Sequence, residues 1–488
     1  MALTKSPLFR EHAYIDGEWV GAGSGATFPV HNPATMDVIA AVPDMDAADT
    51  RRAIAAAEVA LPAWRATTAR ARGKILRRWQ ELMLENQEYL ATLMTSEQGK
   101  PLAEARGEIG FAAAFVDWFA EEGKRVYGDM IPSPNPDWRI AVIKQPVGVC
   151  AAITPWNFPS AMITRKAAAA LAAGCTMVIK PAEDTPLSAL ALAELAEQAG
   201  VPPGVLNVVT GSKAQAPAIG SEFTDNPTVR KITFTGSTGV GRLIMEQSAR
   251  QIKRLSLELG GHAPFIVFDD ADIDAAVAGA MASKFRNSGQ TCVSANRFYV
   301  QEGVYDAFAA KLAEAVGGIK VGYGFDDGVT QGPLINQAAV EKVERHIGDA
   351  TGKGARVLVG GGRHTLGGSF FEPTVLADMT SDMVVSTEET FGPLAPLYRF
   401  RDESEVVALA NASEYGLAGY FYSRDIGRIW RVAEALDYGL VGVNAGVISV
   451  EVAPFGGMKQ SGLGREGSKY GIEEYVEIKY VCLGGIQS

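Results

Sequence analysis

Residues 231–241 read KITFTGSTGVG, a β-rich run that passes through a Gly/Ser/Thr turn into a helical pattern. Similar β-rich runs lie at 148–154, 176–180, 205–209 and 265–268, and amphipathic or alanine-rich segments separate them. Short strands that alternate with helices are typical of βαβ units on a parallel sheet. Right-handed crossovers place the carboxyl ends of such strands at one edge. The sequence therefore predicts an α/β fold with a ligand crevice along that edge.

The regions on either side of these βαβ units have patterns of their own. Residues 50–122 are helical in pattern, and the pattern breaks at Gly123, before a proline-rich turn at 131–136. Residues 138–145 alternate apolar and polar side chains, as an exposed strand does. A second set of strands and helices follows at about 262–445. With 488 residues, the chain is long enough for roughly two or three domains.

The composition indicates a small-molecule ligand rather than a polymer or a membrane. The chain carries 45 basic and 56 acidic residues, and this net charge of −11 argues against a nucleic-acid or anionic-membrane surface. No stretch reaches the roughly 18 apolar residues that span a bilayer, and the N-terminus has no apolar signal segment. Four cysteines are too few for a secreted disulfide framework. We therefore expect an untargeted cytoplasmic protein.

Cys292 is the strongest candidate for a reactive side chain. It ends the run 288–292 (SGQTC), a small, polar, turn-forming setting. Glu258 lies between two leucines and precedes a glycine pair that lets the backbone bend toward a site. A thiol nucleophile and a half-buried general base together suit covalent catalysis, and a buried structural cysteine is the alternative. None of the five histidines lies in a convincing motif, which disfavours a Cys–His protease and a metal site.

Polar residues follow two of the predicted strands. The segment 154–159 (TPWNFP) comes directly after a strand, and its Asn157 amide can donate a hydrogen bond to a developing oxyanion. Lys180 and Glu183 close the next strand, where an acidic residue commonly holds the ribose hydroxyls of an adenine dinucleotide. Taken alone, the first segment is equally a plain strand-to-helix turn, and the second is a solvated sheet edge.

Two glycine-rich runs are candidates for binding phosphate. Residues 236–241 open a predicted helix whose free amides suit a pyrophosphate. The fingerprint G-x-G-x-x-G occurs instead at 462–467, where no strand-turn-helix context surrounds it, and we interpret it as a false positive. A further loop, 388–393, offers a carboxylate for a second ribose and an aromatic ring for a nicotinamide, although by itself it is an ordinary acidic loop.

Together these segments resemble the aldehyde dehydrogenase family over nearly the whole chain. The family's catalytic signatures resemble 257–261 and 288–292. The resemblance implies that Cys292, Glu258 and Asn157 are catalytic. It also implies cofactor contacts from Ile153, Thr154, Trp156, Lys180, Ala182, Glu183, Gly236, Ser237, Val240, Leu259, Glu389 and Phe391. No metal is implied.

Finer features are similar to the succinate-semialdehyde dehydrogenase subfamily. They lie at 162–166, 282–287, 454–457 and 459–471. Within that subfamily two arginines hold the substrate carboxylate, and Arg165 and Arg286 occupy the matching motif positions. A guanidinium fork suits a carboxylate at the far end of a short chain. Ser449 is expected to add a hydroxyl contact. The resemblance implies oxidation of succinate semialdehyde to succinate through a cysteine thiohemiacetal and a thioester.

The resemblance also implies a Rossmann-like cofactor domain, an α/β catalytic domain and a small β oligomerisation element. The expected boundaries are 1–122 with 147–258 for the cofactor domain, 259–445 for the catalytic domain, 123–146 with 470–488 for the oligomerisation element, and 446–469 for a returning segment that lines the active site. We expect a homo-oligomer, either a dimer or a dimer of dimers. Glu183 favours NAD because its charge repels the extra phosphate of NADP, but a swinging side chain leaves NADP use open.

Three alternatives stay open at this point. A glutarate-semialdehyde or broader aliphatic-aldehyde dehydrogenase differs by one methylene, which is worth only about 1–3 kcal/mol of discrimination. A CoA-dependent acylating enzyme would pass the thioester to a thiol rather than to water, and Glu258 argues against it. A purely structural role is disfavoured because the expected catalytic residues are all present.

Overall fold

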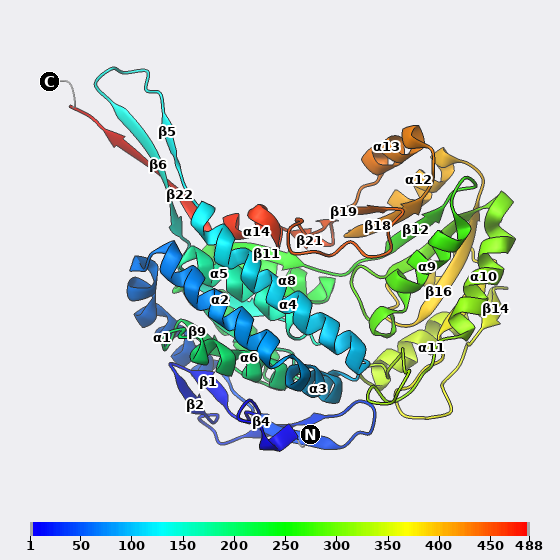
Figure 1. Ribbon diagram of the computed structural model, residues 1–488, viewed down its shortest axis with the longest axis horizontal. Helices are drawn as coiled ribbons and strands as arrows, with labels where there is room; N and C mark the ends of the chain where they lie inside the picture. The colour runs from blue at the N-terminus through cyan, green and yellow to red at the C-terminus, as the bar shows by residue number, and fades with distance from the viewer. Residues whose placement is uncertain (1–2, 486–488) are drawn as a thin grey trace.

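The computed structural model describes residues 3–485, which form two large sheets and a projecting arm (Figure 1). One sheet has eight strands and lies in the half of the molecule that holds the N-terminus. The other has seven strands and lies in the opposite half. Each sheet is covered by helices on its faces, as the alternating sequence pattern predicts.

The eight-stranded sheet has the order β2-β1-β9-β8-β7-β10-β11-β21. Its strands are β1 (Ala13–Ile15), β2 (Glu18–Val20), β7 (Val149–Ile153), β8 (Thr176–Lys180), β9 (Leu206–Val208), β10 (Val229–Thr235), β11 (Arg254–Glu258) and β21 (Gly462–Leu463). The five strands from β9 to β11 are parallel, and β1, β2 and β21 add antiparallel edges. Alternate residues such as Val149 and Cys150 enter separate apolar cores on the two faces.

Eight helices pack around this sheet. They are α1 (Ala47–Ala66), α2 (Ala69–Glu85), α3 (Gln87–Gln98), α4 (Leu102–Glu122), α5 (Ala161–Ala173), α6 (Pro186–Gln198), α7 (Ala216–Asp225) and α8 (Thr238–Ser248). Every residue of α5 is buried, because α5 packs against the sheet on one side and against α2 and α4 on the other. The alanine run of α5 allows this close approach, so the polar residues that α5 carries are enclosed in protein.

The seven-stranded sheet has the order β14-β15-β16-β13-β12-β18-β19. Its strands are β12 (Ala263–Val267), β13 (Ala295–Gln301), β14 (Arg356–Val359), β15 (Thr374–Ala377), β16 (Leu394–Phe400), β18 (Ala418–Tyr422) and β19 (Leu440–Val443). Its helices are α9 (Ile273–Lys284), α10 (Tyr305–Gly317), α11 (Gln337–Gly352), α12 (Glu403–Asn411) and α13 (Ile426–Ala435). Only β14 runs antiparallel among these strands.

The prediction that residues 265–268 continue the first sheet is wrong. They belong to β12, which pairs with β13 and β18 in the second sheet. The chain leaves the first sheet at Glu258 and enters the second at Ala263, so the glycine pair 260–261 lies in the crossing. A five-residue apolar run has the same pattern in either sheet, and therefore the sequence alone does not reveal the crossing.

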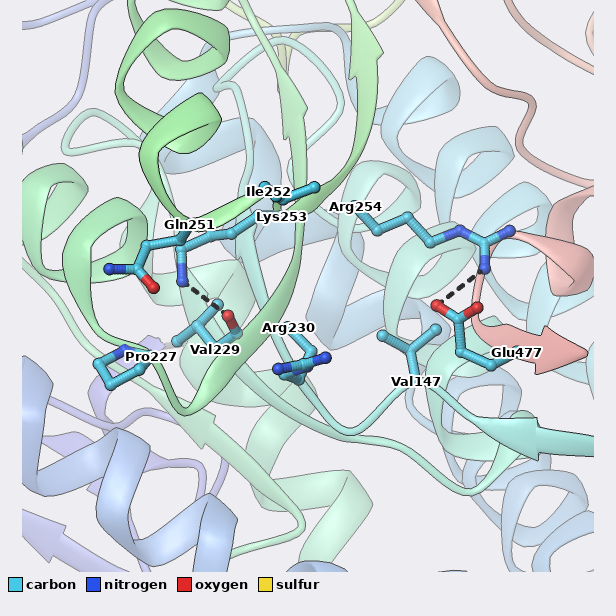
Figure 2. A pocket seen from close by; sticks show the side chains of 9 residues that line it. All are labelled: Val147, Pro227, Val229, Arg230, Gln251, Ile252, Lys253, Arg254 and Glu477. Atoms are coloured by element: carbon cyan, nitrogen blue, oxygen red, sulfur yellow. Dashed lines mark hydrogen bonds and ion pairs between the residues drawn. The ribbon is translucent and has the colours of Figure 1, made fainter. Parts of the chain in front are cut away.

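An arm of three antiparallel strands projects from the body (Figure 1). It consists of β5 (Asp129–Ile131), β6 (Arg139–Pro146) and β22 (Val476–Leu483). Helix α14 (Ser468–Glu473) precedes β22 and packs Ile472 into the core of the body. At the root of the arm, Arg254 of β11 forms an ion pair with Glu477 of β22 at 3.4 Å, beside a hollow that Arg230 and Lys253 also line (Figure 2).

Two small pairings complete the described fold. Strands β3 (Thr27–His31) and β4 (Val38–Pro43) form a hairpin, and β17 (Tyr415–Gly416) pairs with β20 (Met458–Lys459). The second pairing directs the chain from the half that holds the seven-stranded sheet back to β21 at the edge of the first sheet. Among residues 3–485, no helix has the length and apolar character needed to cross a membrane.

Candidate active site

A cavity of about 260 Å³ lies where the two halves of the molecule meet. The first sheet supplies the segments that follow β7, β10 and β11, and the second half supplies Cys292 and the loop after η6 (Val384–Ser386). The lining residues are Pro155, Trp156, Asn157, Met162, Thr235, Gly236, Ser237, Leu259, Gly260, Cys292, Lys342, Glu389 and Phe391. The predicted crevice at the carboxyl edge of the sheet is thus one wall of this cavity.

The loop that carries Cys292 is held in an unusual backbone conformation. Asn287, Ser288 and Gly289 have φ values of +51°, +57° and +74° in succession, within the short helix η4 (Arg286–Gly289). Left-handed backbone at non-glycine residues persists only when neighbouring groups enforce it. Here Asn287 receives a hydrogen bond from Gln98 at 3.0 Å and donates its main-chain N–H to Glu104 at 2.8 Å.

The Cys292 thiol is half-buried at the cavity wall. The pKa of the thiol is raised to about 12, chiefly by burial: Arg165 and Arg286 oppose the rise, and Glu389 and Glu258 contribute to it. The resting thiol is therefore protonated at neutral pH, and a base must accept its proton before the sulfur attacks. Gly261 is required beside it, because a Cβ at that position would collide with the Cys292 carbonyl oxygen.

Asn157 lies in the same cavity wall and is fixed by three hydrogen bonds. Its side-chain Nδ2 donates to the main-chain carbonyl of Gln290 at 3.0 Å. The main-chain carbonyl of Asn157 accepts from Lys100 at 2.8 Å and from the Asn287 side chain at 2.9 Å. Lys100 is itself paired with Glu108 at 2.5 Å, and both side chains are buried. One amide hydrogen of Asn157 serves the protein, so the second is the one available to a ligand.

Glu258 ends β11 and is almost wholly buried. Among the described residues, neither of its carboxyl oxygens has a hydrogen-bond partner. Burial and the nearby Glu466 raise the pKa of Glu258 well above its ordinary value, while Arg165 and Lys166 oppose the rise. An unpaired buried carboxyl with a raised pKa is a candidate general base.

Glu466 is a residue that the sequence analysis missed. It is buried and forms ion pairs with Arg165 and Lys166, two adjacent residues of α5. Although burial opposes its ionisation, the two cations hold the pKa of Glu466 below its ordinary value. Its signal was the glycine pattern at 462–467, which makes left-handed turns at Gly464 and Gly467 on either side of Glu466.

The predicted substrate residues Arg165, Arg286 and Ser449 lie outside the cavity lining. The guanidinium of Arg165 stacks on the Phe455 ring at 4.1 Å, and that of Arg286 lies 5.4 Å from the Phe158 ring. Both arginines are close enough to lower the pKa of Cys292. Ser449 lies in the loop between β19 and β20, half-buried, and the structure does not bring it into the lining of the cavity.

Most of the predicted cofactor residues lie at or just after the carboxyl ends of the first-sheet strands, and about half of the whole set line the cavity: Trp156, Gly236, Ser237, Leu259, Glu389 and Phe391. Ser237 is the N-cap of α8, where its hydroxyl accepts from the Val240 N–H at 3.4 Å. Lys180, at the end of β8, is buried and lies 3.4 Å from Glu183, whose side chain is 31% exposed. Ile153 and Thr154 end the neighbouring strand, Ala182 is buried next to Lys180, and Leu259 follows Glu258.

These residues fit an adenine dinucleotide. The buried Thr154 hydroxyl has no partner among the described residues, and the N-terminus of α8 presents amides toward the same wall. Trp156 and Phe391 meet edge to face, with their ring centroids 5.6 Å apart, and form an aromatic border of the cavity. Glu389 accepts from the Gly261 N–H at 3.0 Å, and burial raises the pKa of Glu389 to about 7.

Lys342 of α11 is a second lining residue that the sequence analysis missed. It lies close enough to lower the pKa of Glu389. Helix α11 has an ordinary amphipathic pattern, so nothing in the sequence marks this lysine as facing a cavity.

Comparison with known proteins gives a consistent result. A sequence model of the aldehyde dehydrogenase family matches residues 19–481. A glutarate-semialdehyde dehydrogenase of Pseudomonas aeruginosa is 65% identical over 486 residues, covering 100% of both chains. An NADP-linked succinate-semialdehyde dehydrogenase of Escherichia coli is 65% identical over 484 residues, covering 99% of this chain and 100% of the relative. The crystal structure of succinate-semialdehyde dehydrogenase from Burkholderia pseudomallei superimposes with a TM-score of 0.97 at 64% identity, covering 98% of this chain and 99% of the other.

Proposed function

The chain belongs to the aldehyde dehydrogenase family, and from this we propose that it oxidises succinate semialdehyde to succinate with a nicotinamide dinucleotide. The observation that carries the proposal is a pair of arginines just outside the cavity lining. The Nη1 of Arg165 lies 3.7 Å from the sulfur of Met162, which lines the cavity, and the guanidinium of Arg286 lies 5.4 Å from the Phe158 ring. Arg165 and Arg286 are both near enough to Cys292 to lower the pKa of its thiol. A short aldehyde with a terminal carboxylate can reach the thiol with one end and a guanidinium with the other.

In the proposed first step, the Cys292 thiol releases its proton to solvent, and the thiolate sulfur forms a bond to the aldehyde carbon. The negative charge moves to the aldehyde oxygen, where the free amide hydrogen of Asn157 and the Cys292 N–H stabilise it. Removal of one such donor typically costs about 2.7–4 kcal/mol. The fixed position of Asn157 supports this role, because three hydrogen bonds already hold it in place.

The second half of the reaction returns the thiol. When bound, the dinucleotide supplies the acceptor for the hydride that leaves the aldehyde carbon, and that carbon becomes a thioester on Cys292. Glu258 then removes a proton from a water molecule, whose oxygen attacks the thioester carbon and breaks the bond to sulfur. A raised pKa makes the Glu258 carboxylate a stronger base near neutral pH. Succinate leaves, and the sulfur is protonated again.

Glutarate semialdehyde is the second candidate substrate. The Pseudomonas aeruginosa relative carries that name at the same 65% identity as the succinate-semialdehyde relative. The two substrates differ by one methylene, which is worth about 1–3 kcal/mol. Both carry the terminal carboxylate that the arginine pair suits.

We propose NAD as the preferred cofactor, with NADP also accepted. Glu183 follows the end of β8 by three residues, a position that suits contact with the adenosine ribose, and its charge disfavours a 2′-phosphate. Its single contact to Lys180 is 3.4 Å long and its side chain is 31% exposed, so the carboxylate has room to move aside. The Escherichia coli relative is named for NADP, which supports dual use.

We also propose the expected domain roles and assembly into a homo-oligomer. Residues 1–122 with 147–258 serve the cofactor, 259–445 carry the nucleophile, 446–469 return to the site, and 123–146 with 470–488 assemble copies of the chain. Exposed Met130, Ile478 and Tyr480 on the arm support assembly, as does β22, which is an edge strand. Light scattering on the purified protein distinguishes a monomer, a dimer and a dimer of dimers. A catalytic thiol suits the reducing cytoplasm.

The test is a kinetic comparison of aldehydes. We expect kcat/KM for succinate semialdehyde to exceed that for butanal by roughly a hundredfold, because butanal lacks the carboxylate. Arg165→Ala and Arg286→Ala should raise KM for the semialdehyde and leave butanal oxidation nearly unchanged, with Ser449→Ala a weaker case. Equal activity on both aldehydes would keep the dehydrogenase and remove the semialdehyde assignment. A series with glutarate semialdehyde fixes the chain length.

A further inference from the structure

Three charged side chains are buried together behind the cavity. Arg165 and Lys166 are adjacent on α5, and both form ion pairs with Glu466. Their side chains are 1%, 0% and 4% exposed, so all three are enclosed in protein. A charge of this kind is costly to bury unless it is paired.

The charges of these ion pairs do not cancel. Glu466 uses one oxygen for each cation, and two cations therefore share one negative charge. Lys166 has a further acceptor in the Thr235 hydroxyl at 2.6 Å. The Nη2 of Arg165 is buried and has no partner among the described residues. The surplus positive charge of the group is thus concentrated on the guanidinium end of Arg165, which lacks an acceptor.

The guanidinium adjoins the cavity through Met162. The Met162 sulfur lies 3.7 Å from the Nη1 of Arg165, and Met162 also lines the cavity that contains Cys292. Methionine is unbranched and adaptable, so it can give way to a ligand that approaches Arg165 from the cavity. A carboxylate that displaced it would find an unpaired donor already directed by the protein.

The elements that hold Arg165 are tied to one another. Its guanidinium stacks on the Phe455 ring at 4.1 Å while its Nε pairs with Glu466. Phe455 and Glu466 exchange two main-chain hydrogen bonds, each 2.8 Å long. The ring and the carboxylate therefore fix the plane and the direction of the guanidinium as one unit.

We propose that Glu466 is a positioning residue that orients Arg165 toward the terminal carboxylate of the substrate, and so sets the preference for carboxylated aldehydes over neutral ones. The inference rests on the proposed function, because it concerns the same substrate. If Glu466 orients Arg165, its loss changes the ratio of kcat/KM for carboxylated and neutral aldehydes. If Glu466 acted only on proton transfer at Glu258, both aldehydes would be affected equally.

The experiment measures kcat and KM for succinate semialdehyde and for butanal with Glu466→Gln. Loss of the ion pair should raise KM for the semialdehyde by roughly tenfold to a hundredfold, while KM for butanal changes by less than about twofold. The ratio of the two kcat/KM values should fall accordingly. Glu466→Asp keeps the charge with a shorter reach and should restore the ratio to within about threefold of the wild type.

The matched control is Glu474→Gln. Glu474 pairs with the buried Lys231 at 3.5 Å and accepts a hydrogen bond from the Ser256 hydroxyl at 3.1 Å, contacts that do not involve Arg165, so the ratio should not change. If Glu466→Gln fails to fold, Phe455→Leu removes the stacking ring but keeps the main-chain bonds, and the ratio should again fall.

Equal losses on both aldehydes, or an unchanged ratio in the variant that folds, would overturn the inference. Failure of the proposed function is visible separately. In that case the wild-type protein itself would not prefer succinate semialdehyde to butanal.

Discussion

The two walls of the cavity hold their charges in opposite ways. Behind the substrate wall, Arg165 and Glu466 form an ion pair with side chains only 1% and 4% exposed. On the proposed cofactor side, at the end of β8, Lys180 and Glu183 are 3.4 Å apart and the carboxylate is 31% exposed. Charges in a low dielectric interact strongly and are little screened by salt, whereas an exposed carboxylate is screened and free to move. The substrate wall is rigidly charged and the cofactor wall is adjustable, so we expect strict selection of the aldehyde and permissive selection of the dinucleotide.

The largest expected effect comes from removing the Cys292 thiol, which lies between the two walls. Cys292→Ala should lower kcat by roughly a thousandfold or more, because no thioester can form. The walls themselves should remain, so NAD binding measured by fluorescence titration should stay within about twofold of the wild type. Cys482→Ala, on the exposed arm strand, is the control and should keep full activity. Turnover of the Cys292 variant at the wild-type rate would contradict the covalent scheme.

The next effect separates the two halves of the reaction. Glu258→Gln should lower the steady-state rate by roughly a hundredfold to ten-thousandfold, because the amide cannot deprotonate water. Stopped-flow measurement of NADH should then show a burst before slow turnover, since hydride transfer, which forms NADH and the thioester, precedes hydrolysis. A slowed burst would assign Glu258 to thiol activation as well. An unchanged steady-state rate would remove it as the base.

The cofactor wall should respond to pH, which sharpens the contrast. Burial raises the pKa of Glu389 to about 7, so the carboxyl is neutral below that pH and ionised above it. An ionised carboxylate accepts hydrogen bonds from ribose hydroxyls better, and KM for NAD should fall about tenfold from about pH 6 to pH 8. Glu389→Gln should flatten this dependence. The neighbouring exposed Glu388→Gln should retain it, and a flat wild-type profile would exclude Glu389 as the titrating group.

The smallest effect concerns the choice of dinucleotide. Glu183→Ser removes the charge that opposes a 2′-phosphate, and kcat/KM with NADP should rise about three- to tenfold. The effect is modest because the carboxylate already has room to swing away. Steady-state kinetics with both dinucleotides measures it. A change of a hundredfold would show that the cofactor wall is as rigid as the substrate wall.

The two walls also differ in how far they can be predicted from the sequence. Lys180 ends β8, and Glu183, Gly236 and Ser237 lie within three residues of a strand end, so strand-end positions indicate their place in a parallel sheet. Glu466 lies 300 positions after Lys166, and only the complete fold brings the two together. A pattern within a short window cannot report a pair at that separation.

The nucleophile loop shows the same limit. The polar, glycine-containing run before Cys292 predicts a turn, and the structure has one. The left-handed φ values of Asn287 and Ser288 depend on Gln98 and Glu104, which come from the distant α3–α4 region. The sequence of the loop therefore predicts its location but not the strain that the rest of the protein imposes on it.

The late return of the chain to the first sheet has a consequence for biosynthesis. Strand β21 pairs with β11 at residues 462–463, and Ile472, Tyr475 and Val476 complete the core that α2, α4 and α5 share. A ribosome must therefore release the chain as far as Val476 before the first sheet and its core can finish folding. Until then the groove reserved for these residues is an exposed apolar surface, which is the kind of surface that chaperones bind and that promotes aggregation. Glu466, which pairs with Arg165 and Lys166, is also synthesised late, so a chain that ends before it lacks these buried ion pairs.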